Sequence, residues 1–157
     1  MATEIERKFL VSGTGWQTLV KHSTAIRQAY LSQIGATTIR IRIVDDAEAF
    51  LTIKSPQLGP ARSEFEYSIP LDDARALITL RTGIAIEKRR HIVQMGDFRW
   101  EIDVFEGAHA GLVIAEIELR DAAAAFERPQ WLGEEVTGDP RYYNAYLAAH
   151  GAGDNAP

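Results

Sequence analysis

Cysteine is absent from this chain of 157 residues. That absence excludes a disulfide framework, a thiolate nucleophile and a zinc site built on thiolates. A chain without cysteine fits a reducing compartment, and we expect a cytoplasmic protein.

Long apolar runs and an excess of positive charge are also missing. No stretch reaches 18 uninterrupted apolar residues, and no basic segment followed by an apolar run stands at the N-terminus, so we expect neither a membrane span nor a signal peptide. The formal net charge is -5 at pH 7, which argues against a broad nucleic-acid surface. We therefore expect no membrane and no nucleic acid among the partners.

The common catalytic motifs are missing as well. No serine sits in a nucleophile-elbow motif, and no glycine-rich loop could cradle a phosphate. The histidines show no metal-ligand spacing and are expected at the surface: His22, His91, His109 and His150.

Period-two alternation is the strongest positive signal. Over residues 37–44, three isoleucines share one face of an extended chain, and Arg40 and Arg42 share the other. Short hairpins link most of the segments of this kind, which favours an antiparallel sheet. We expect eight strands, at 4–11, 25–33, 37–44, 48–54, 62–69, 84–94, 98–105 and 112–119.

Helices are expected between and after these strands. The segments are 16–21, 70–80, 121–128 and 141–149, with Asp139 as the N-cap and Pro140 at the first position of the last helix. The chain shows no interdomain linker, so we expect one domain over 1–150 and a flexible tail over 151–157.

The alternation alone allows two arrangements of the charged strand faces. They could face water around an apolar interior, or they could line a closed eight-stranded barrel whose apolar outside is covered by helices. Charges inside a barrel are costly unless they are paired or ligand-bound. Acidic and basic members nearly balance here, so mutual pairing could support such a lumen.

The chemistry of an inward-facing set would be specific. Glutamate and aspartate oxygens are hard ligands that suit Mg²⁺ or Mn²⁺. Arginine and lysine in number suit a polyanion, because arginine can hold phosphate oxygens in a bidentate manner. Both sets in one lumen point to phosphoryl transfer on a substrate with several adjacent phosphates.

The first strand begins with Glu4-Ile5-Glu6-Arg7-Lys8, an ExExK pattern, and further elements follow in order. Together they resemble the CYTH superfamily of triphosphate tunnel metalloenzymes over about residues 3–147. The resemblance implies a mainly β (α+β) fold, an eight-stranded antiparallel closed barrel with charges inside, covering helices and a C-terminal plug helix. The further elements are Arg40-Ile41-Arg42, Leu51-Thr52-Ile53-Lys54, Arg62-Ser63-Glu64-Phe65-Glu66, Glu87-Lys88-Arg89-Arg90, Glu101-Ile102-Asp103 and Glu116-Ile117-Glu118.

The resemblance also implies site residues and a metal cofactor, two ions of Mg²⁺ or Mn²⁺. It gives Glu4, Glu6 and Glu118 as principal metal ligands. Glu64, Asp103 and Glu116 would support a second metal and the attacking water. Lys8, Arg40, Arg42, Arg62, Lys88 and Arg90 would hold the triphosphate, with Glu66 and Glu101 orienting these cations.

Tyr30 and Lys54 resemble a Tyr–Lys pair of the bacterial inorganic triphosphatases in this superfamily, with Lys54 also a substrate contact. A packed barrel aromatic is the other interpretation of Tyr30. Tyr143 stands where the superfamily often has Ser or Lys, which leaves a ligand role for the last helix open. A homodimer through one barrel face is the assembly that the superfamily suggests.

Three functions remain in view from the sequence. The first is metal-dependent hydrolysis of inorganic triphosphate (tripolyphosphate) to pyrophosphate and phosphate. The second uses the same tunnel for ATP cyclisation, or for a nucleoside or thiamine triphosphate, although the His-Phe element of the cyclases is missing. Thiamine recognition would want a tryptophan at the tunnel mouth; Trp16 and Trp100 look like packing residues, and Trp131 cannot be placed. The third is a polyphosphate-binding module without catalysis.

Overall fold

The computed structural model describes residues 5–32, 37–56 and 63–150. Its strands are all joined by antiparallel pairing into one sheet, in the order β5-β4-β3-β2-β6-β7-β8-β1-β9, which confirms the predicted mainly β class. The strands are β1 (Ile5–Val11), β2 (Val20–Ser32), β3 (Thr38–Val44), β4 (Glu48–Lys54), β5 (Glu64–Ser68), β6 (Thr82–Met95), β7 (Phe98–Glu106), β8 (Val113–Leu119) and β9 (Leu132–Glu135).

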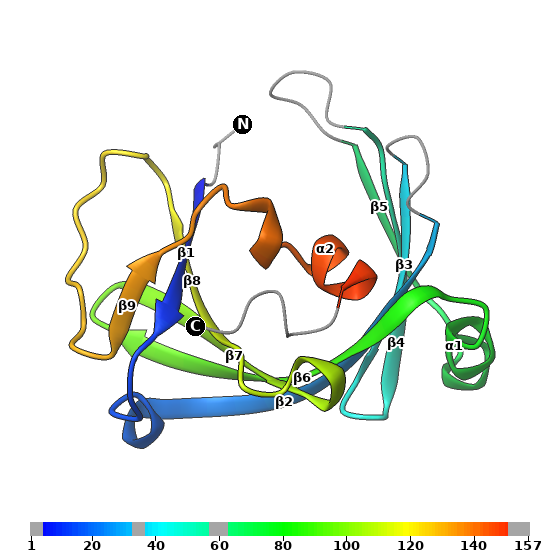
Figure 1. Ribbon diagram of the computed structural model, residues 1–157, viewed down its shortest axis with the longest axis horizontal. Helices are drawn as coiled ribbons and strands as arrows, with labels where there is room; N and C mark the ends of the chain where they lie inside the picture. The colour runs from blue at the N-terminus through cyan, green and yellow to red at the C-terminus, as the bar shows by residue number, and fades with distance from the viewer. Residues whose placement is uncertain (1–4, 33–36, 57–62, 151–157) are drawn as a thin grey trace.

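The sheet curls into a C-shaped section, with β5 and β9 at its two ends (Figure 1). Within the described residues these two strands do not pair. The predicted barrel was closed, whereas the observed sheet is not closed by hydrogen bonds. The prediction also missed β9, which adds a ninth strand against the outer edge of β1. This strand is only Leu-Gly-Glu-Glu and has no apolar alternation to reveal it.

The apolar strand faces point outward, which confirms the arrangement with the charges inside. Helix α1 (Leu71–Ile78) covers one part of this face, where Ala74 and Ile78 pack on Ile41 and Ile43. The other part is covered by chain without a helix. There, Trp16 and Trp131 pack against the strand residues Phe9, Val93, Trp100, Ile102, Ala115 and Ile117. We call this group of residues the outer cluster.

Two of the predicted helices differ from the structure. The segment 16–21 forms only a 3-10 helix at Gln17–Leu19 before β2 begins. The segment 121–128 is not helical: Asp121 closes one turn by accepting a hydrogen bond from the backbone N–H of Ala123, and Phe126 then packs on Phe9 and Trp100. The link from β8 to β9 must cross the outer cluster, and an extended path places this ring there.

The last predicted helix is split at Tyr143, whose backbone is extended with ψ 140°. A 3-10 helix at Pro140–Tyr142 precedes the break, with Asp139 as its side-chain cap as predicted, and α2 (Asn144–Ala149) follows it. Helix α2 lies within the C of the sheet (Figure 1). No helix among the described residues has the length and apolarity needed to cross a membrane.

Helix α2 is held in the concave face by apolar and polar contacts. Leu147 and Ala148 are fully buried in a cluster with residues of β6, β7 and β8. Below them, His109 is fully buried, and its Nε2–H donates to the carbonyl oxygens of Leu147 and His150. The prediction that the histidines lie at the surface is therefore wrong for His109.

Gly83 tests how closely α2 must approach the sheet. Its φ is +70°, and a Cβ there would lie 2.3 Å from the carbonyl oxygen of Ala148. We expect Gly83→Ala to lower the free energy of unfolding by about 2–4 kcal/mol, measured by urea denaturation. The matched control is Gly96→Ala, at φ +59° with nothing within 4 Å of the new Cβ, which should cost only about 1 kcal/mol. Equal losses in the two variants would contradict the close contact.

Candidate active site

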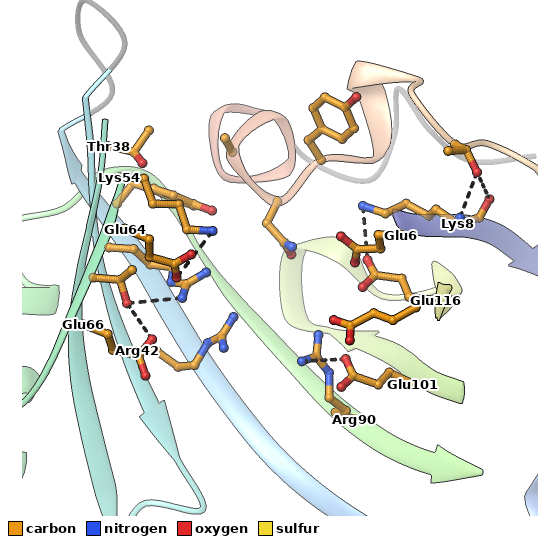
Figure 2. Close-up of a pocket in the computed structure, with 18 of the residues that line it drawn as sticks. Glu6, Lys8, Thr38, Arg42, Lys54, Glu64, Glu66, Arg90, Glu101 and Glu116 are labelled. Atoms are coloured by element: carbon orange, nitrogen blue, oxygen red, sulfur yellow. Dashed lines mark hydrogen bonds and ion pairs between the residues drawn. The ribbon is translucent and has the colours of Figure 1, made fainter. Parts of the chain in front are cut away.

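The charged inner face of the sheet encloses a cavity of about 720 Å³ (Figure 2). One wall, which we call the acidic wall, is lined by Glu6, Lys8, Glu101 and Glu116. The opposite wall, which we call the basic wall, is lined by Arg42, Lys54, Glu64 and Glu66. Arg90 lies at the floor between them. The remaining lining residues are Tyr30, Thr38, Arg40, Thr52, Glu118, Thr137, Gly138, Tyr143, Asn144 and Ala145.

Strand register brings these side chains together. Directly opposed residues of neighbouring strands share a face, so a charged face on each strand gives rows of charges across the sheet. On the acidic wall, one row runs through Lys8, Glu116 and Glu101. On the basic wall, another runs through Tyr30, Arg40, Thr52 and Glu66.

Glu6 and Glu116 form the core of the acidic wall. The hydrogen bond to Glu116, burial and the charges of Glu116 and Glu118 raise the pKa of Glu6 to about 8, although Lys8 opposes the rise. For Glu116, burial works against ionisation, but the hydrogen bond from Glu6 and the charge of Lys8 lower its pKa. The two carboxyl groups therefore share one proton at neutral pH, as expected where two carboxylates lie close together, even though Lys8 Nζ lies 3.2 Å from Glu116 Oε1.

The residue types on this wall fit a hard divalent cation. Glu6, Glu116 and Glu118 line the cavity with carboxylate oxygens, which Mg²⁺ and Mn²⁺ prefer. The described residues contain no group of three Asp, Glu, His or Cys side chains already arranged around one metal position. Mg²⁺ commonly takes only one or two protein carboxylates and completes its shell with substrate phosphates. Glu4, the remaining predicted ligand, lies outside the described residues.

Asp103 differs from the other predicted metal ligands, because it lies beneath the cavity and does not line it. Its Oδ2 accepts hydrogen bonds from Lys88 Nζ at 2.7 Å and from Arg90 Nη2 at 2.9 Å, and its Oδ1 accepts from Arg90 Nε at 2.8 Å. Against the effect of burial, Lys88 and Arg90 hold the pKa of Asp103 well below its usual range. This geometry favours a role in anchoring two cations, and the predicted metal role stays a prediction.

Arg40 and Arg42 are bonded to neutral groups instead. Arg42 Nε donates to Gln28 Oε1 at 2.9 Å, and Arg40 Nη2 donates to Thr52 Oγ1 at 3.3 Å. Burial, together with the charges of Arg40 and Arg90, lowers the pKa of Arg42 to about 10. Arg42 is therefore cationic at neutral pH. Both arginines line the cavity, and neither forms an ion pair within the described residues.

The two predicted orienting carboxylates contact the basic set differently. Glu101 Oε2 lies 3.0 Å from Arg90 Nη1, as predicted, whereas Glu66 reaches Arg40 only through the hydroxyl of Thr52. Tyr30 and Lys54 both line the cavity, and Lys54 Nζ lies 3.9 Å from Glu64 Oε1. Arg62 lies outside the described residues.

The C-terminal segment supplies site residues that the prediction left open. Lys8 Nζ donates to the carbonyl oxygen of Tyr142 at 3.1 Å and lies 5.4 Å from the centre of the Tyr143 ring. Lys88 Nζ donates to Asn144 Oδ1 at 3.2 Å. These contacts place Tyr143 and Asn144 at the edge of the cavity, where the sequence signal was only their position in the expected plug helix.

Other lining residues were missed. Thr52 could have been found, because it shares a strand face with Lys54. Thr137 and Gly138 follow the unpredicted strand β9, so no signal marked them.

Trp131, which the sequence could not place, lies in the outer cluster with Trp16 and Trp100, so all three tryptophans lie away from the cavity.

Comparisons with known proteins agree with this arrangement. An inorganic triphosphatase of Acetivibrio thermocellus is 44% identical over 148 residues, covering 94% of each chain. An inorganic triphosphatase of Nitrosomonas europaea is 39% identical over 150 residues, covering 93% of this chain and 97% of that protein. A crystal structure of an inorganic triphosphatase superposes with a TM-score of 0.76 at 36% identity, over 96% of this chain and 97% of the other. The model of the CYTH domain matches residues 2–143, and the chain belongs to the CYTH family.

Proposed function

We propose that this protein is a metal-dependent hydrolase that cleaves inorganic triphosphate to pyrophosphate and phosphate. The observation that carries the proposal is the cavity itself, where an acidic wall faces two arginines that form no ion pair within the described residues. Relatives at 44% and 39% identity over most of the chain are inorganic triphosphatases, which supports the same substrate here.

In the reaction, a water oxygen forms a bond to a terminal phosphorus, the bond to the bridging oxygen breaks, and pyrophosphate leaves. Mg²⁺ or Mn²⁺, held by Glu6, Glu116 and Glu118 with Glu4, would neutralise phosphate charge and make the water more acidic. Arg40 and Arg42 hold phosphoryl oxygens and stabilise the charge that moves to the leaving group. Glu116, whose pKa is lowered, stays ionised and accepts the water proton.

Arg90, Lys54 and Tyr30 would hold the substrate in position. Asp103 fixes the guanidinium of Arg90 in one orientation, so its free N–H groups are held ready for a phosphate oxygen. Tyr30 and Lys54 approach from the basic side of the cavity, where they can hydrogen-bond the leaving group. Two metal ions, a homodimer and a cytoplasmic location also stay predictions.

Specific observations weigh against the other functions. Thiamine recognition would want a stacking tryptophan at the mouth of the cavity, and all three tryptophans lie in the outer cluster. A binding module for anions gains nothing from crowded carboxylates: the hydrogen bond to Glu116, burial and charge repulsion together raise the pKa of Glu6, and negative charge on this wall opposes an anionic ligand.

The test is phosphate release by the purified protein from tripolyphosphate, ATP and thiamine triphosphate, offered separately with Mg²⁺, Mn²⁺ or a chelator. We expect fast release from tripolyphosphate only, dependent on metal and lowered at least about a hundredfold in Glu6→Gln. Equal rates of phosphate release from tripolyphosphate and from ATP would contradict inorganic triphosphate as the specific substrate. Binding without turnover under every metal would contradict the proposal that the protein is an enzyme.

Metal affinity should depend on pH through the shared proton of Glu6 and Glu116. Because the pKa of Glu6 is raised to about 8, a cation must displace a proton below that pH. We expect Mn²⁺ affinity, measured by calorimetry without substrate, to rise about tenfold per pH unit from pH 6 to 8 and then to level off. Glu6→Gln should bind weakly with no such slope, and a wild-type affinity independent of pH would contradict the shared proton.

Asp103 and Glu118 should respond differently to loss of charge. Asp103→Asn leaves Lys88 and Arg90 buried without their anion, so we expect the free energy of unfolding to fall by about 3–5 kcal/mol. Glu118→Gln removes a charge that repels Glu6, so stability should hold while activity falls. Denaturant unfolding and phosphate release measured on both variants check this. A stable but inactive Asp103→Asn would instead favour the metal role.

A further inference from the structure

The cations in and beneath the cavity fall into two classes by partner; Lys88, a predicted substrate contact, is buried beneath the cavity with Asp103 and does not line it. Lys8, Lys54, Lys88 and Arg90 each lie within 4.0 Å of a carboxylate oxygen, at distances of 3.2, 3.9, 2.7 and 2.8 Å. Arg40 and Arg42 contact a hydroxyl and an amide instead. An ion pair partly cancels the field that a cation presents to an anion, so these two arginines should attract phosphate most strongly.

Gln28 is the neutral partner of Arg42. It lies on β2 directly opposite Arg42 on β3, and its side chain is fully buried. A guanidinium Nε–H can only donate, which fixes the amide with Oε1 toward Arg42. The Nε2 of Gln28 is buried and has no hydrogen-bond partner within the described residues. The NH₂ group of Gln28 is thus left without a partner, while its carbonyl oxygen holds Arg42.

We propose that Gln28 is a positioning residue for Arg42, and that its neutrality is what the site requires; this rests on the proposed function. The Oε1 contact occupies the Nε side of the guanidinium, so the Nη groups are turned to the cavity that Arg42 lines. Glutamate would offer the same acceptor geometry but would cancel the charge. Glutamine separates the two effects, because it orients the cation without neutralising it.

Gln28→Glu is the sharpest test, because its two effects have opposite signs. The new carboxylate would pair with a buried arginine, so the melting temperature without ligand should stay equal or rise. Affinity for tripolyphosphate, measured by calorimetry in chelator so that no turnover occurs, should fall about tenfold or more. A matched control is Gln94→Glu, which adds the same charge at an exposed position of β6 and should leave the affinity unchanged; its melting temperature should fall slightly, because Gln94 Nε2–H donates to the carbonyl oxygen of Gly96.

Gln28→Met tests orientation without adding charge. It has a similar size, but its thioether is only a weak acceptor for Arg42 Nε–H, so tripolyphosphate affinity and catalytic efficiency should both fall about tenfold, the usual effect of losing a hydrogen bond to a charged group. If Gln28 acts through Arg42, the same change in an Arg42→Met background should weaken tripolyphosphate binding less than twofold further. Circular dichroism and melting curves establish that the variants fold.

The outcomes separate this inference from the proposed function. Wild-type protein that neither binds nor hydrolyses tripolyphosphate overturns the proposed function. Wild-type activity together with unchanged affinity in Gln28→Glu, or additive losses in the double variant, overturns the role of Gln28 alone. If Gln28→Glu fails to fold, the cycle with Gln28→Met decides.

Discussion

The ion cluster of Asp103, Lys88 and Arg90 is the interaction on which the rest of the site depends. Two cations on one strand would repel each other in a buried position, and a single carboxylate on the neighbouring strand accepts hydrogen bonds from both. Lys88 then reaches Asn144 at the start of α2, so the same cluster ties the C-terminal segment to the floor of the cavity. Breaking it would leave buried charge at three places in the fold.

The partner of each cation decides how strongly that cation can attract an anion in the cavity. Where a cation has a carboxylate partner, the protein gains a fixed side chain and gives up part of its attraction for an anion. Where the partner is a hydroxyl or an amide, as for Arg40 and Arg42, the side chain is fixed and the attraction is retained. The acidic wall shows the converse, because the hydrogen bond between Glu6 and Glu116, together with burial, leaves a shared proton there.

Alternation along the strands was enough to predict most of the sheet and the charged strand faces that carry Lys8, Arg40, Arg42 and Glu116. The prediction that these faces point inward came from the resemblance to the CYTH superfamily. Period two is a local property, and the cavity follows from it once the register is set. The depth of Asp103 below its neighbours depends on Lys88 and Arg90 across the sheet, which no local pattern records. His109 was misjudged for a similar reason, since its burial comes from the carbonyl groups of α2. Strand β9 is too short and too polar to be visible in the sequence.

The pairing of β1 constrains the order in which the site can form. Both neighbours of this strand, β8 and β9, come from the last part of the chain, although β1 is made first. During synthesis β1 can therefore pair only after β8, which ends at Leu119, has emerged from the ribosome, and its other edge waits for β9, which ends at Glu135. The hairpins of the basic wall can form earlier, because their partners are close in sequence. Glu6 and Glu116 therefore come together only after β8 has been made, later than the side chains of the basic wall.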